Sequence, residues 1–135
     1  MIDRVSHATV FVLDQDSAKA FYTEKLGFEV RQDVSMDGFR WLTVGPRTQP
    51  DLELILAPLA PPMFDPDIAE QMRSLVSKGV LGPGVLHTPD CRAAYRELSA
   101  KGVTFVQEPA ERPYGIEAIL RDDSGNWFSL TERSA

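Results

Sequence analysis

The chain has 135 residues, which suits one domain or two half-sized units fused together. Its 43% hydrophobic and 25% charged content excludes disordered and collagen-like chains, and its lone cysteine excludes a disulfide scaffold. Twenty acidic residues against 14 basic ones give a formal charge of −6. Because phosphate binding needs clustered Lys and Arg, and no such cluster is present in the sequence, we expect no nucleic-acid partner.

The apolar runs are too short for a membrane span, which needs roughly 20 residues. The first residues carry the acidic Asp3 and lead into no long apolar core, unlike a secretory signal. We therefore expect a cytoplasmic protein with no membrane partner.

The first half of the chain predicts one strand, one helix and three further strands. Asp14 is a good N-cap for the helix, and Gly27 ends it. In chain order, the elements are Val5–Leu13, the helix Gln15–Leu26, and the strands Phe28–Val34, Phe39–Val44 and Leu52–Ala57.

A helix over Asp65–Lys78 follows, with Pro66 at its first turn and Gly79 after its end. Its apolar residues fall on one stripe, which we expect to be buried: Ile68, Met72, Leu75 and Val76. The remaining predicted elements are the strand Gly84–His87, the helix Cys91–Lys101, and the strands Thr104–Gln107, Ile116–Arg121 and Trp127–Thr131.

The order strand–helix–strand–strand–strand therefore occurs twice, which predicts an internal duplication. A shift of 76 residues carries Asp14 onto Asp90. The same shift carries Phe28 onto Thr104, Glu53 onto Ser129 and Leu54 onto Leu130. Few identities survive, so the repeat lies in the pattern of elements.

The segment HATVFVLDQDSAKAFYTEKLGFEV resembles the opening of the vicinal-oxygen-chelate superfamily, which includes glyoxalase I, bleomycin-resistance proteins, fosfomycin-resistance enzymes and extradiol dioxygenases. The second half has features similar to that family: Asp90, Tyr95, Lys101-Gly102-Val103, Tyr114-Gly115 and Asp122–Asn126.

This resemblance implies an α+β fold of two βαβββ modules, whose sheets curve around a shared cavity, in a homodimer. We expect residues 1–135 to form a single such domain. Module 1 would cover about residues 1–60, a linker helix about 64–79, and module 2 about 83–133.

Strand alternation predicts which side chains face the cavity. Successive side chains of a strand point to opposite faces, so apolar Leu52 and Leu54 facing the helices turn Glu53 the other way. The same alternation turns His7 into the cavity. The resemblance implies that a His and a Glu from each module hold a divalent metal, and His7 and Glu53 match the first module's pair.

The second module departs from that pattern, because the shift of 76 carries His7 onto Pro83 and Glu53 onto Ser129. Proline has no donor atom, and neutral serine is a poor ligand for a divalent cation. We therefore expect an incomplete site for Zn, Ni, Mn or Fe that a chelating substrate would have to complete.

Further residues are expected on the cavity wall. His87 shares the inward alternation but lies four residues beyond Pro83, roughly 13 Å along the strand, so it replaces the missing ligand poorly. The expected substrate-binding residues are Phe11, Trp41, Glu117, Trp127 and Ser129. Cys91 stands at a helix start, where the helix dipole favours a thiolate, although a small residue in the first helical turn is its ordinary explanation.

Two functions follow from these expectations, and the sequence does not choose between them. The first is a glyoxalase- or dioxygenase-like lyase, isomerase or dioxygenase that acts on a small oxygen-bearing molecule, with His7, Glu53 and His87 as catalytic residues and a metal on His7 and Glu53. The alternative is a metal-free protein that sequesters an aromatic or drug-like compound, as in the bleomycin-resistance branch. A module kept only for dimerisation or regulation is a third reading.

Overall fold

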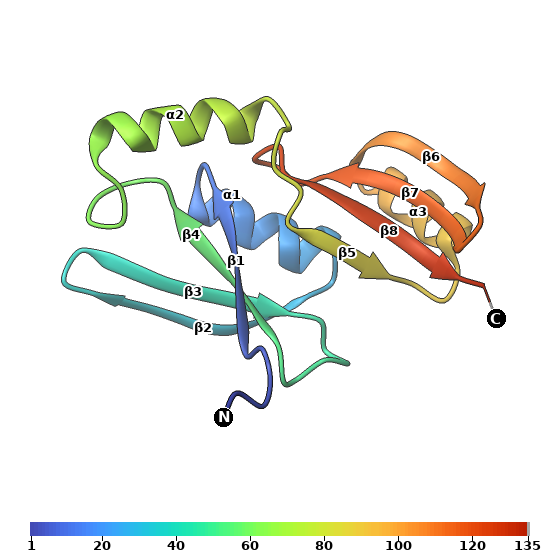
Figure 1. Cartoon of the computed structure of the whole chain (residues 1–135), viewed down its shortest axis with the longest axis horizontal. Helices are drawn as coiled ribbons and strands as arrows, with labels where there is room; N and C mark the ends of the chain where they lie inside the picture. The colour runs from blue at the N-terminus through green and yellow to red at the C-terminus, as the bar shows by residue number, and fades with distance from the viewer. Residues whose placement is uncertain (135) are drawn as a thin grey trace.

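A computed structural model describes residues 1–134 and contains two four-stranded sheets, each built from one half of the chain (Figure 1). The first sheet has the order β1-β4-β3-β2 and the second the order β5-β8-β7-β6. The strands of the first sheet are β1 (His7–Val12), β2 (Glu29–Met36), β3 (Phe39–Gly45) and β4 (Glu53–Pro58). Those of the second are β5 (Gly84–His87), β6 (Thr104–Arg112), β7 (Gly115–Arg121) and β8 (Trp127–Arg133).

Each sheet is covered by the helix that follows its first strand, and the start of each helix is capped as the sequence predicts. α1 (Gln15–Ala20) begins after Asp14, whose carboxylate accepts a hydrogen bond from the Ser17 amide. α3 (Cys91–Ala100) begins after Asp90, which caps it in the same way. The third helix, α2 (Pro66–Ser77), joins the two halves. No helix within residues 1–134 has both the length and the apolar character that crossing a membrane demands.

The element bounds confirm the predicted duplication. β3 and β7 are 76 residues apart at both ends, as are the first residues of α1 and α3. In both sheets the first strand pairs in parallel with the last, and the remaining pairs are antiparallel. The chain thus has the α+β fold of two βαβββ modules, called module 1 and module 2 below.

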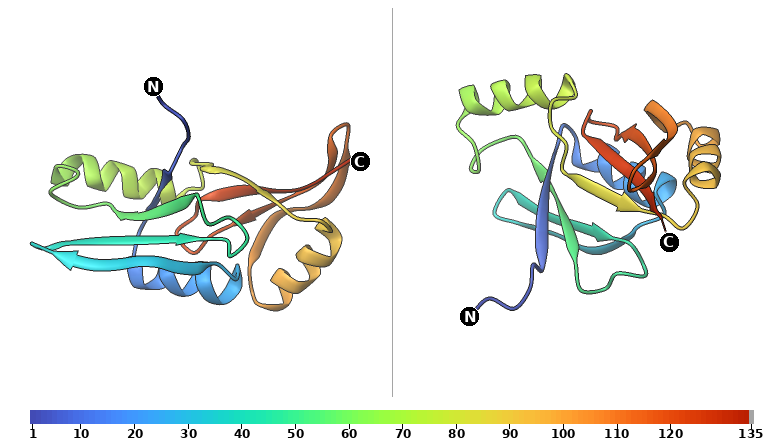
Figure 2. Two further views of the ribbon diagram at one scale, coloured as in Figure 1. Left: turned by 90° about the horizontal axis from the view of Figure 1, so that it is seen from below. Right: turned by 45° about the vertical axis from the view of Figure 1, so that its right-hand side comes forward.

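The two modules lie side by side with their sheets unjoined (Figure 1). α1 and α3 lie on one side of the sheets, whereas α2 and the N-terminal segment lie on the other (Figure 2). We call the sheet faces turned away from α1 and α3 the open faces. Side chains on the opposite faces form the core: Val10, Val12, Leu42, Val44 and Leu56 from module 1, and Ala118, Leu120, Phe128 and Leu130 from module 2.

Two sequence predictions are wrong in detail. The first strand starts at His7 rather than Val5, because the segment before it extends away from the body and leaves Val5 exposed. In α2 only part of the predicted apolar stripe is covered: Val76 is buried, whereas Ile68 is 41% and Leu75 42% exposed. The helix packs on the modules along a narrower line than its apolar pattern indicates.

A buried carboxylate joins the two modules. Asp122 lies in the turn between β7 and β8, and its Oδ1 accepts hydrogen bonds from the amides of Ser124, Gly125 and Asn126, each at 2.9 Å. Its Oδ2 accepts from the Tyr22 hydroxyl of module 1 at 2.6 Å. Burial, and then the Asp122 charge, raise the pKa of Tyr22 well above its usual value.

Other bonds from the same turn reach the junction of β1 and α1. The side-chain amide of Asn126 donates to the carbonyl of Phe11 at 2.8 Å, and the backbone amide of Leu13 donates to the Ser124 hydroxyl at 2.9 Å. Ser17 donates to Asp123 at 2.7 Å. The turn is therefore what fixes the position of module 2 against module 1.

We expect the Tyr22→Phe substitution to lower the free energy of unfolding by about 1 to 2 kcal/mol, because it removes a buried hydrogen bond to a charged acceptor. Urea denaturation measures the change. Tyr95→Phe is the matched control, since its hydroxyl makes only a long, exposed contact of 3.4 Å to Glu108. Equal stability of the two variants would contradict the role given to the Asp122 turn.

Candidate functional site

His7 and Glu53 lie side by side on the open face of module 1. They are register partners in the parallel pair β1–β4, and the His7 Nε2 atom lies 3.8 Å from Glu53 Oε1. Thr43 of β3 donates to the same Glu53 oxygen at 2.6 Å. The His7 Nδ1 atom is 2.9 Å from the Ser6 hydroxyl. Strand alternation thus brings an imidazole and a carboxylate into one polar group, as the sequence predicts.

Aromatic side chains lie beside this pair and further along β1. The Trp41 ring lies 5.8 Å from the His7 ring, centroid to centroid, and its indole donates to Gln32 at 2.6 Å. Phe11 packs edge-on against Phe64, which precedes α2, with centroids 5.4 Å apart. Module 1 therefore offers an aromatic surface with one acidic centre, suited to a flat organic ligand.

The open face of module 2 holds a different polar group. The Glu117 carboxylate accepts hydrogen bonds from the Ser129 hydroxyl at 2.5 Å and the Tyr114 hydroxyl at 2.8 Å. The Ser129 oxygen is 2.7 Å from that of Thr131. The hydrogen bond from Ser129, and after it the one from Tyr114, hold the pKa of the Glu117 carboxyl below its usual value. Glu117 is therefore ionised at neutral pH. A cavity of about 330 Å³ is lined by Val85, Tyr114, Glu117, Ser129, Thr131 and Arg133.

The other predicted wall residues lie apart from these two groups. His87 is exposed and lines a different hollow together with Thr48 and Gln49. The Trp127 indole packs against Gly82, where an added Cβ would overlap the ring. Neither residue lines the cavity at Glu117.

The donor set does not fit a family-type metal centre. Within residues 1–134 no group of three or more His, Cys, Asp or Glu side chains is gathered closely enough to hold an ion. The duplicated positions are Pro83, which has no donor, and Ser129, whose hydroxyl proton is committed to Glu117. His7 and Glu53 are thus the only matched ligands, and we derive no step through a metal.

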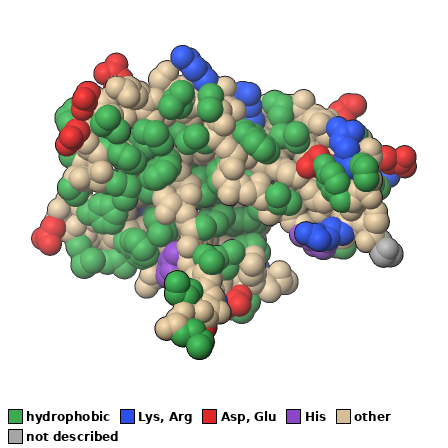
Figure 3. Space-filling view, in the orientation of Figure 1, with side chains coloured by type: hydrophobic (Ala, Val, Ile, Leu, Met, Phe, Trp, Pro, Cys, Tyr) green, Lys and Arg blue, Asp and Glu red, His purple; other side chains and the backbone are tan. Residues whose placement is uncertain are grey.

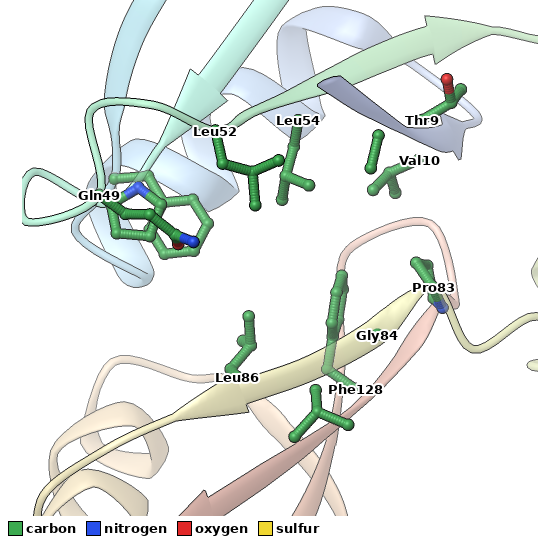
Figure 4. A pocket seen from close by; sticks show the side chains of 13 residues that line it. Thr9, Val10, Gln49, Leu52, Leu54, Pro83, Gly84, Leu86 and Phe128 are labelled. Atoms are coloured by element: carbon green, nitrogen blue, oxygen red, sulfur yellow. The ribbon is translucent and has the colours of Figure 1, made fainter. Parts of the chain in front are cut away.

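A second, apolar cavity of about 230 Å³ lies between the modules (Figure 4). Leu52 and Leu54 of module 1 lie on one side of it, and Leu86 and Phe128 of module 2 on the other. These side chains alternate with Glu53 and Ser129 along their strands, so the cavity is separate from both polar groups.

Cys91 occupies the first position of α3. Its thiol is fully buried and donates to the Leu130 carbonyl at 3.4 Å. Burial raises the pKa of the thiol. The structure therefore agrees with the ordinary explanation of Cys91, a small residue packed in the first turn of the helix.

Several residues of the site were missed by the sequence reasoning. Thr43 and Thr131 share the alternation of Trp41 and Ser129, so the same two-residue period could have identified them. Phe64 lies in a loop and Tyr114 at a strand turn, where no periodic signal exists. Only the tertiary structure brings these two aromatic residues to the open faces.

Comparison with known proteins gives a consistent family. The family model described as Glyoxalase/Bleomycin resistance protein/Dioxygenase superfamily matches residues 4–130. The crystal structure of UcmS2 superposes with a TM-score of 0.95 at 57% identity, covering 98% of this chain and 99% of that one.

Two further relatives cover nearly the whole chain. TnmS3, an antibiotic binding protein from Streptomyces sp. CB03234, has a TM-score of 0.79 and 32% identity, over 98% of each chain. The uncharacterized protein YurT of Bacillus subtilis (strain 168) is 37% identical over 126 residues, which are 93% of this chain and 95% of that protein.

We expect Zn, Ni, Mn and Fe(II) to bind no more tightly than the millimolar range, because two protein donors leave most of the coordination sphere to water. Calorimetric titration of chelator-treated protein measures the affinity, with His7→Ala and Glu53→Gln as controls for non-specific heat. Micromolar binding that either substitution abolishes would contradict this expectation and revive the metal-dependent lyase, isomerase or dioxygenase.

Proposed function

The chain belongs to the Glyoxalase/Bleomycin resistance protein/Dioxygenase superfamily, and we propose that it is a cytoplasmic binding protein that sequesters an aromatic, antibiotic-like small molecule. The single observation that carries this proposal is the open face of module 1, where the Trp41 indole lies against the His7 imidazole beside the Glu53 carboxylate, and Phe11 and Phe64 pack together further along β1.

The chemistry of the open faces supports binding over metal-dependent turnover. The resemblance implies a Lewis-acid metal held by ligands from both modules, whereas module 2 contributes a hydroxyl network at the matched position. Rigid aromatic side chains contribute large contact area at low entropic cost, as a sequestering site requires.

The relatives support the same proposal. TnmS3 is described as an antibiotic binding protein and is similar to this chain over its full length. Fold alone does not fix function, so the argument depends on the residues of the open faces and not on the resemblance alone.

We further propose that two copies pair through their open faces. Apolar side chains that a single chain leaves uncovered include Val34, Met36, Met63, Ile68, Leu75 and Val85. Hydrophobic atoms spread widely over the face turned to the viewer in Figure 3. Uncovered apolar side chains favour association, and a second copy would complete the wall around each half-site.

We expect polycyclic aromatic antibiotics to quench tryptophan fluorescence, and Trp41→Ala to weaken their binding by about tenfold or more, since it removes the largest ring of the face. Trp41→Phe, which keeps a ring, should retain most of the affinity, and circular dichroism checks that both variants fold. Mass spectrometry should recover the compound intact. A modified product would contradict sequestration and indicate an enzyme, and unchanged affinity in Trp41→Ala would remove module 1 as the site.

We expect the purified protein to sediment as a dimer, and Val34→Asp to raise the dimer dissociation constant by about tenfold or more, because a charge is placed within an apolar contact. Sedimentation velocity measures both. Ser99→Asp adds the same charge on α3, away from the open faces, and should leave the dimer intact. A monomeric wild type would contradict the pairing.

A further inference from the structure

We propose that the module 2 cavity recognises hydroxyl groups of the ligand, because its hydrogen-bond network presents oxygen lone pairs and no free hydroxyl proton. The proposal rests on the proposed function and deepens it by naming the part of the ligand that module 2 recognises.

The direction of the network starts at Glu117. An ionised carboxylate only accepts hydrogen bonds, so both hydroxyls that touch it must donate. Tyr114 therefore donates to Oε1 and Ser129 to Oε2. Each hydroxyl has a single proton, and both protons are consumed by the carboxylate.

Ser129 then fixes its neighbour. Since the Ser129 proton points to Glu117, the 2.7 Å contact between Ser129 and Thr131 requires Thr131 to donate. The protons of all three hydroxyls are thereby directed along the network. What remains for a ligand in the cavity is acceptor capacity on the Tyr114, Ser129 and Thr131 oxygens.

Burial keeps this arrangement in place. Ser129 is 5% and Thr131 7% exposed, and both residues line the cavity. Tyr114, by contrast, is 52% exposed and stands at the rim, where an entering ligand meets it first. Satisfied buried networks of this kind are specific, because a wrong partner leaves a polar atom unpaired.

The surrounding charges favour a neutral hydroxyl over an ammonium group. Arg112 Nε lies 3.9 Å from Glu117 Oε1, and Arg133 lines the cavity. Two guanidinium groups oppose a cationic ligand, and the Glu117 oxygens are already engaged. A phenol or a sugar hydroxyl supplies the needed donor without charge.

The first test compares matched probes by NMR titration: naphthol, its methyl ether and naphthylmethylamine. We expect naphthol to bind about fivefold tighter than the ether, as one added hydrogen bond allows, and tighter than the amine. Thr131→Val should remove the preference for naphthol while leaving ether binding unchanged. Thr104→Val, the same change at an exposed position of β6, should leave the preference intact.

The outcomes separate this proposal from the proposed function. Equal binding of naphthol and its ether overturns hydroxyl recognition but leaves sequestration standing, as does a preference that Thr131→Val does not alter. Tighter binding of the amine overturns the choice of a neutral group. Failure of all three probes to bind overturns the proposal, and the antibiotic titration then decides whether sequestration falls with it.

The second test needs no ligand. Hydrogen bonding to Glu117 raises the pKa of Tyr114, because the carboxylate stabilises the protonated phenol and opposes phenolate. The difference between the absorbance titrations of wild type and Tyr114→Phe should show the raised pKa of Tyr114. The Glu117→Gln substitution should lower that pKa. Glu117→Gln should also reduce the preference for naphthol, since an amide donates and releases a hydroxyl proton. An unchanged Tyr114 titration overturns the network.

Discussion

The geometry of both open faces depends on one buried carboxylate. Asp122 accepts three amides of its own turn and the hydroxyl of Tyr22 from the other module. Removing a charged group of this kind from water is unfavourable unless its lone pairs are satisfied, and here both oxygens are engaged. The turn that connects β7 to β8 is therefore also the connector of the two modules, and it sets where Glu117 and Ser129 stand relative to His7 and Glu53.

The duplication is not symmetrical at this point. In module 1 the corresponding turn carries Pro46 in place of Asp122, and Arg31 stabilises it from outside. The Arg31 guanidinium donates to the carbonyls of Pro46 at 2.7 Å and Gln49 at 3.0 Å. Module 2 thus organises its turn with an acceptor inside the turn, Asp122, and module 1 with a donor from β2, Arg31. The Asp122 turn also bonds to the neighbouring module.

The same divergence separates the two polar groups. Module 1 keeps the imidazole and carboxylate that resemble half of a metal site, whereas module 2 places a serine at the matched position and binds it to a carboxylate from the next strand. The two modules of one duplicated scaffold therefore carry different polar groups at their matched positions. Neutral hydroxyls form directional hydrogen bonds but are poor ligands for a divalent cation, so the serine changes what module 2 can hold at this position.

Local patterns in the sequence predicted much of the fold. Asp14 and Asp90 cap their helices, and strand alternation places His7 beside Glu53. What local patterns did not indicate depends on long-range packing: the exposed side of α2, and the position of Trp127 against Gly82. Phe64 and the bond from Tyr22 to Asp122 join segments that no periodicity relates. The sequence therefore predicted the faces of the strands better than the partners those faces acquire.

The helical segment after β1 widens from α1 into a π-helical turn over Phe21–Lys25, and its two first residues are both buried. A regular helix would separate neighbouring side chains by about 100° around the axis, since it has 3.6 residues per turn. Loss of one residue from this turn would restore the regular winding and turn the phenol of Tyr22 away from Asp122. The modules would then keep their separate folds but lose their common alignment. The length of this short segment is therefore more tightly constrained than its residue types.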